Sequence, residues 1–141
     1  MALPELDNLV RIGSLKAEAC TQGEFDGLLR SGSVRPKDAQ NTANSLESRF
    51  DLAYNAAHAL SLAALRWHGY RSEHRYTVFQ SLTHTLKLPA EQWRVLDQAH
   101  RKRNLAEYEG DLDVDAALLA ALIRVALEVA ARAEALGAVK R

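Results

Sequence analysis

The sequence predicts an all-α protein, an up-and-down helical bundle of about five helices. Apolar residues recur at steps of three and four along most of the chain, the spacing that places them on one face of a helix. The alternation and the β-branched runs that indicate strands are absent from the sequence. Most of the three prolines and seven glycines fall at plausible joints. The joints are short, which favours antiparallel neighbours.

The composition is that of one globular domain. With 141 residues the chain is long enough to bury a single core. It carries 18 basic and 18 acidic side chains, so the formal net charge is zero and any anion-binding site must be local. Cys20 is the only cysteine, which excludes an intramolecular disulfide and fits a reducing cytoplasm. Glu5 and Asp7 interrupt the N-terminal stretch as no signal peptide does, so we expect a cytoplasmic protein that does not enter a membrane.

The sequence of the first third of the chain predicts three helical segments. An amphipathic helix is expected over about residues 3–20, because Leu6, Leu9 and Val10 lie on or near one face. A short helix over residues 24–30 is expected to end at the sequence Ser31-Gly32-Ser33. Pro36 suits the first turn of a new helix, because its missing N–H would be unpaired there anyway.

The longest apolar seam runs through residues 46–67. Its positions alternate steps of four and three, and they are Leu46, Phe50, Ala53, Ala57, Leu60, Ala64 and Trp67. We expect this helix to end at Gly69 and to be the architectural spine of the bundle. Its seam should face the two last helices of the chain.

Three more helices are expected to follow. Ser72 can cap the first of them, which runs to about Leu88, and Pro89 opens the next, which breaks at residues 110–111. The last helix starts at Asp113 or Asp115, and its core positions include Leu118, Leu122, Val125, Val129 and Leu136. The additional apolar residues Leu119, Ile123 and Leu127 widen its apolar surface beyond what one small bundle can bury. The sequence therefore predicts a homodimer with two-fold symmetry.

A dense polar cluster stands at residues 101–109, with the sequence Arg101-Lys102-Arg103-Asn104-Leu105-Ala106-Glu107-Tyr108-Glu109. An arginine can hold a phosphate in a fork of hydrogen bonds, and a phenol can donate a further bond to a phosphate oxygen or stack on a base. We expect Arg103, Asn104 and Tyr108 to line one concave surface that binds a phosphate-bearing ligand, with Arg101 or Lys102 at its rim. The plainer interpretation is a charged helix end, where each cation stabilises the helix by about 0.3–1 kcal/mol.

The geometry of a helix limits this site. Five residues along an ideal helix correspond to about 500° of rotation, so Arg103 and Tyr108 would not share a face. They can converge only if the helix ends or bends near residues 105–107, or if a second subunit completes the site. Gly110, two residues beyond Tyr108, makes an early end plausible.

Three segments together resemble the HEPN domains (higher eukaryotes and prokaryotes nucleotide-binding). Residues 50–58, with the sequence Phe-Asp-Leu-Ala-Tyr-Asn-Ala-Ala-His, look like the second helix of that family, and residues 67–72 look like the turn after it. Residues 99–108, which contain the Arg-Asn pair and the later tyrosine, look like the signature region. The resemblance covers roughly residues 46–136 and implies a single HEPN-like helical domain over residues 1–141.

The resemblance implies two alternative functions. HEPN ribonucleases carry an arginine, often followed by a polar residue and then a histidine, dimerise so that two motifs line one cleft, and cut RNA without metal. Arg103 and Asn104 match the first two positions, but the histidine position falls on Tyr108, and His100 precedes the arginine. The resemblance thus implies a noncatalytic module, without metal or cofactor, that binds a nucleotide, RNA or a partner protein. Such modules often accompany a nucleotidyltransferase or belong to toxin–antitoxin and defence systems.

The alternative is a metal-independent endoribonuclease that uses Arg103, Asn104 and Tyr108. Cleavage of RNA needs a base for the ribose 2′-OH and an acid for the leaving oxygen, and histidine suits both roles near neutral pH. A tyrosine has a pKa of about 10 and is a poor base. Phosphate binding therefore survives the replacement of histidine by Tyr108 better than catalysis does.

Overall fold

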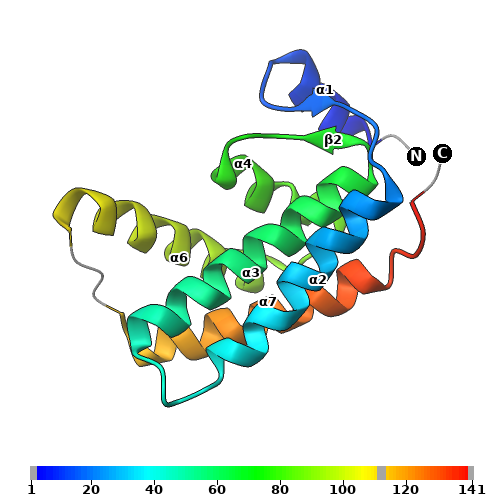
Figure 1. Cartoon of the computed structure of the whole chain (residues 1–141). Helices are drawn as coiled ribbons and strands as arrows, with labels where there is room; N and C mark the ends of the chain where they lie inside the picture. The colour runs from blue at the N-terminus through cyan, green and yellow to red at the C-terminus, as the bar shows by residue number, and fades with distance from the viewer. Residues whose placement is uncertain (1–2, 111–113, 140–141) are drawn as a thin grey trace.

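The computed structural model describes residues 3–110 and 114–139 and confirms the all-α class. Its helices are α1 (Pro4–Arg11), α2 (Gln22–Ala39), α3 (Leu46–Trp67), α4 (Arg75–Gln80), α5 (Leu82–Thr85), α6 (Ala90–Glu109) and α7 (Ala116–Glu134). Two short strands, β1 (Lys16–Ala17) and β2 (Tyr70–Arg71), pair in the antiparallel direction. Figure 1 shows α2, α3 and α7 side by side, while the second half of α6 extends away from them. None of the described helices is long and apolar enough to cross a membrane.

Helix α3 has the bounds that the seam predicts. The hydroxyl of Ser45 caps it by accepting a hydrogen bond from the backbone N–H of Ser48 (3.1 Å). The interior seam positions are fully buried: Phe50, Ala53, Ala57, Leu60 and Ala64. The two ends differ, because Leu46 is exposed and Trp67 is half-buried. The seam packs against α7 as expected, but α2 covers α3 more extensively than α6 does.

The expected first helix over residues 3–20 is too long. Helix α1 ends at Arg11, and Gly13 follows it with a φ of 85°, a left-handed conformation that favours glycine. Residues 16 and 17 then pair with residues 71 and 70. A partner strand more than fifty residues away determines the structure here, so the local apolar spacing could not indicate it.

The predicted break at residues 31–33 is also wrong, because α2 continues through it. A Cβ atom on Gly32 would lie 2.3 Å from Cγ of Leu60, so this glycine allows α2 to approach α3 closely. Pro36 lies inside the helix, near its end at Ala39, and not at the start of a new one. The side chain of Thr21 accepts from the N–H of Glu24 (3.1 Å) and caps the start of α2.

The later boundaries are partly as predicted. The expected single helix over residues 72–88 is split into α4 and α5, and Ser72 accepts from the N–H of His74 before α4 begins. Pro89 directly precedes α6, and Gly110 ends it with a φ of 73°. Asp115 caps α7 by accepting from the N–H of Ala117 (2.9 Å). Asp111 and Asp113 lie outside the described residues.

The apolar surface of α7 is mostly covered by this chain itself. Leu119 and Ile123 are 2% and 7% exposed, because α7 packs against both α2 and α3. Of the three residues on which the homodimer prediction relied, Leu127 alone is exposed, at 40%. The width of the apolar surface on α7 therefore gives no support to a dimer.

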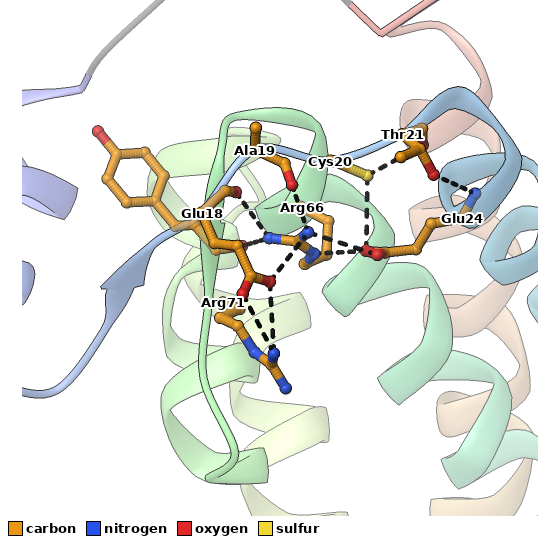
Figure 2. Close-up of polar contacts among 8 residues, drawn as sticks. Glu18, Ala19, Cys20, Thr21, Glu24, Arg66 and Arg71 are labelled. Carbon is orange, nitrogen blue, oxygen red and sulfur yellow. Dashed lines mark hydrogen bonds and ion pairs between the residues drawn. The ribbon is translucent and has the colours of Figure 1, made fainter.

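A buried arginine attaches the N-terminal segment to the bundle. Arg66 of α3 is 4% exposed, and Figure 2 shows its guanidinium between Glu24 and the backbone of residues 18 and 19. It donates to Glu24 Oε2 (2.6 Å) and to the carbonyl oxygens of Glu18 (2.8 Å), Ala19 (2.9 Å) and Tyr70 (3.3 Å). We name these residues the Arg66 cluster. Beside it lies a second apolar core made of Leu6, Leu15, Leu65, Tyr70 and Val78.

Candidate functional site

The predicted site residues lie on different faces of α6. The helix is continuous from Ala90 to Glu109, so it does not end between Arg103 and Tyr108. The side chain of Arg103 turns toward α3, where its Nε lies 3.6 Å from Asp51 Oδ1. Tyr108 is 91% exposed. These two side chains therefore do not converge within one subunit.

The expected rim residues belong to another surface. Arg101 and Lys102 line a shallow groove of about 370 Å³ between α6 and α7, together with Gln98, Leu105, Asp115 and Leu118. Nη2 of Arg101 forms an ion pair with Asp97 Oδ2 at 3.2 Å. The three consecutive cations thus divide between the side of α6 that faces α3 and the side that faces α7.

A histidine links α3 to α6 at the side where Arg103 points. The Nδ2 of Asn104 donates to Nε2 of His100 (3.2 Å). Because Nε2 then accepts a hydrogen bond, the proton of the neutral imidazole lies on Nδ1 for this orientation of the amide. Nδ1 then donates to the hydroxyl oxygen of Tyr54 (3.0 Å). Both ring nitrogens of His100 are therefore occupied by groups of the protein.

Arg75, at the start of α4, completes this group of side chains. Its Cζ lies 5.4 Å from the centre of the Tyr54 ring, within the distance of a cation–π interaction. Its Nη1 donates to the side-chain oxygen of Asn55 (3.2 Å), a neutral partner. We name Tyr54, Asn55, Arg75, His100 and Asn104 the His100 cluster. Within the described part of the chain, Arg75 forms no ion pair with a carboxylate.

The electrostatics of the His100 cluster keep its histidine neutral. Burial lowers the pKa of His100 below its usual 6.5, and Arg75 lowers it further, whereas Asp97 and Glu107 raise it. The pKa of the Tyr54 phenol is raised, chiefly by burial, while Arg75 and Arg103 act in the opposite direction. At neutral pH, Arg75 is therefore the charged member of the His100 cluster, and Arg103 stands beside it.

Sequence reasoning identified part of this site. Asn104 belongs to the His100 cluster and Arg103 lies next to it, but Tyr108, Arg101 and Lys102 do not join it. His100 precedes the arginine and therefore does not match the motif, although its spacing of four residues from Asn104 is a signal that links the two side chains. Tyr54 and Asn55 lie in the segment that resembles the second HEPN helix. No local pattern identified Arg75.

The described residues offer no obvious metal site: no three His, Cys, Asp or Glu side chains among them are grouped so that they could hold an ion. Cys20 donates to the carbonyl oxygen of Thr21 (3.2 Å) and to Glu24 (3.6 Å). Burial, and then the charge of Glu24, raise the pKa of its thiol, so it is a weak nucleophile.

Comparison of the chain with protein-family models, with curated proteins and with solved structures finds no match.

Proposed function

We propose that the chain is a noncatalytic HEPN-like module that binds RNA through its phosphates at the His100 cluster. The observation that carries the proposal is Arg75, an exposed guanidinium that donates a hydrogen bond to the neutral side chain of Asn55 and has no carboxylate partner among the described residues. A guanidinium without a carboxylate partner can still offer its fork of N–H groups to a phosphate. Asn104 is also exposed and lies one hydrogen bond from His100, so it can supply a neutral donor beside the cation.

The occupied imidazole favours binding over cleavage. A general base must have a free nitrogen within reach of the ribose hydroxyl, and both nitrogens of His100 have protein partners. The raised pKa of Tyr54 makes its phenol a still weaker base. Tyr108 is fully separated from Arg103 within one subunit, so the pair of residues in the signature region does not supply an acid and a base together.

The experiment compares arginines on two faces of the molecule. Arg75→Ala should weaken the binding of a fluorescent single-stranded oligoribonucleotide about 10- to 150-fold, the equivalent of the about 1.5–3 kcal/mol of a hydrogen bond to a charged group. Arg101→Ala removes the same charge from the α7 side of α6 and should leave the affinity within about twofold. Arg103→Ala should have an intermediate effect, because Asp51 already neutralises part of its charge. Equal losses in Arg75→Ala and Arg101→Ala would contradict a local site.

One observation favours the ribonuclease as the alternative. Burial lowers the pKa of His100, so its imidazole is neutral at pH 7 and could accept a proton if Asn104 turned away. The test is RNA incubated with the protein and a chelator. The proposal predicts intact RNA with the wild type. Cutting that is abolished by His100→Ala would establish the ribonuclease instead, and cutting by Tyr108→His alone would indicate a scaffold that has lost its catalytic residue.

The surface of α6 supports a homodimer better than that of α7 does. The last turns of α6 extend away from the bundle (Figure 1), and Leu105 and Tyr108 are 51% and 91% exposed there. The cations at residues 101–103 precede the anions Glu107 and Glu109. We propose that two α6 helices pair in antiparallel fashion about Leu105, which sets the cations of each subunit opposite the anions of the other.

Such a pairing places the partner subunit's Tyr108 opposite Lys102, on the side of α6 that faces α7 and away from the side where Arg103 points. Light scattering should give twice the monomer mass for the wild type and the monomer mass for Leu105→Glu. Leu127→Glu, which changes an exposed leucine of α7, should stay dimeric. A wild-type protein that is monomeric at high concentration would contradict the pairing. A nucleotidyltransferase partner or a toxin–antitoxin role remains a proposal that rests on the resemblance alone.

A further inference from the structure

One aromatic ring beside the His100 cluster lies at the surface and is held in place. Tyr76 follows Arg75 in α4 and is 41% exposed. Its ring centre lies 6.4 Å from that of Trp93, at an interplanar angle of 71°, and 5.7 Å from that of His100, at 44°. The neighbouring rings of Tyr54 and Phe79 are each 1% exposed and cannot reach a ligand without rearrangement.

The other exposed tyrosine near the site is different. Tyr108 is 91% exposed and makes no ring contact within the described chain, so it is not held in one orientation. A ring that its neighbours already hold loses little conformational entropy when a ligand stacks on it. Tyr76 therefore suits a stacking contact, and Tyr108 serves as a natural control.

The position of Tyr76 next to Arg75 suggests what stacks there. Every nucleobase has a flat π face, and only an unpaired base can leave its own stack to lie on a protein ring. Arg75, the adjacent residue, has an exposed guanidinium that can hold a phosphate of the same strand. The ring of Tyr76 contacts His100, and Arg75 lies over the ring of Tyr54, which is hydrogen-bonded to His100. A flat aromatic surface and a cation therefore border the same cluster and match the two chemical parts of a nucleotide.

We propose that Tyr76 is a stacking site for an unpaired nucleobase of a strand whose phosphate Arg75 holds. The ligand is then single-stranded RNA and not duplex RNA. This inference rests on the proposed phosphate site at the His100 cluster and adds the recognition of the base to it.

The experiment separates the base from the phosphate. Fluorescence anisotropy compares a single-stranded RNA decamer, an abasic decamer with the same number of phosphates, and a duplex of the same sequence. The wild type should bind the base-containing strand about 5- to 150-fold more tightly than the abasic strand, the equivalent of about 1–3 kcal/mol for a stacked base. The duplex should bind no more tightly than the abasic strand.

Variants of two tyrosines then locate the effect. Tyr76→Leu should reduce the affinity for the base-containing strand to that for the abasic strand and leave the abasic strand unaffected, whereas Tyr76→Phe should keep the preference. Tyr108→Leu should change neither affinity. Wild-type protein that binds both strands equally, or a Tyr76→Leu loss that is equal for both, overturns the stacking site and leaves the phosphate site intact. Absence of binding to every strand overturns the proposed function and this inference with it.

Discussion

Arg66 and Arg75, two arginines that lie on or against α3, have opposite environments. Arg66 is buried, and its guanidinium donates to Glu24 and to three backbone carbonyl oxygens, as Figure 2 shows for two of them. Arg75 is exposed, and its partners are the neutral amide of Asn55 and the side chain of Tyr54, over whose ring it lies. A guanidinium whose donors are all used stabilises the fold, whereas one with donors to spare is available to a ligand. The number of arginines in a region therefore says less about its function than the number of their unused N–H groups.

The largest expected effect comes from removing the saturated arginine. Arg66→Leu should lower the free energy of unfolding by about 3–5 kcal/mol, because it leaves buried carbonyl oxygens without a donor and Glu24 without its cation. Arg75→Leu should change it by less than about 0.5 kcal/mol, as substitutions of exposed side chains usually do. Urea denaturation followed by circular dichroism measures both. Similar losses in the two variants would remove the distinction between the Arg66 cluster and the His100 cluster.

Acid should destabilise the surroundings of the His100 cluster and the Arg66 cluster at different pH values. His58 of α3 lies beside the His100 cluster, where its ring packs edge-on against Phe79. Burial lowers the pKa of His58 from 6.5 to about 4, and Arg75 adds to the shift. Between these two pH values the unfolded chain binds a proton at this histidine and the folded chain does not. The free energy of unfolding therefore falls as the pH drops from 6.5 to about 4, by about 3 kcal/mol in total. The bond to Arg66 lowers the pKa of Glu24 below its usual 4.5, so that contribution is lost only below pH 4.5.

The pH experiment has a matched variant. Denaturation midpoints measured from pH 7 to pH 4 should slope downward for the wild type and should be much flatter for His58→Leu. Arg66→Lys should leave the slope between pH 6.5 and 5 unchanged, since Glu24 titrates below this range. A wild-type stability that is constant over this range would show that His58 is accessible to protons in the folded state.

Two glycines of α2 show a similar contrast between a crowded and an open position, and we expect smaller effects on stability from them. Gly32→Ala should destabilise the protein by about 1–3 kcal/mol, because the new methyl group would collide with Leu60. Gly27→Ala should stabilise it by about 0.5–1 kcal/mol, because a Cβ there meets no atom within 4 Å and alanine favours the helix. Thermal unfolding of both variants measures the difference. Stabilisation by Gly32→Ala would show that α2 and α3 separate easily.

The sequence predicted those elements whose signals are local. The α3 seam, the start of α6 after Pro89 and its end at Gly110 depend on spacing or on one residue type, and the structure has all three. Gly32 carried the same type of signal as Gly110 but does not end a helix, because its role is set by Leu60, which lies 28 residues later. A glycine that breaks a helix and one that admits a neighbouring helix look alike in sequence.

The candidate site was harder to predict, because its members come from separate helices. Asn104 and Arg103 lie within one polar run, and composition indicated them. Arg75 and His100 come together at Tyr54 only because α4 packs against α3 and α6, and the sequence predicts a start of α4 that is two residues too early. The end of α6 at Gly110 agrees with the local signal, and this continuity of the helix past Tyr108 is what keeps Arg103 and Tyr108 on different faces.

The connections of Arg66 also bear on the order in which the chain acquires its structure during synthesis. The groups that Arg66 binds near the N-terminus precede it by 42 to 48 residues. A ribosome must therefore release most of α3 before residues 18–24 find the guanidinium that holds them. In the folded protein Leu6 is the single buried side chain of α1. Before α3 has emerged, Leu6 has no core against which to pack. Pulse-labelling hydrogen exchange on nascent chains of increasing length should show protection of residues 3–20 only after Arg66 has left the exit tunnel.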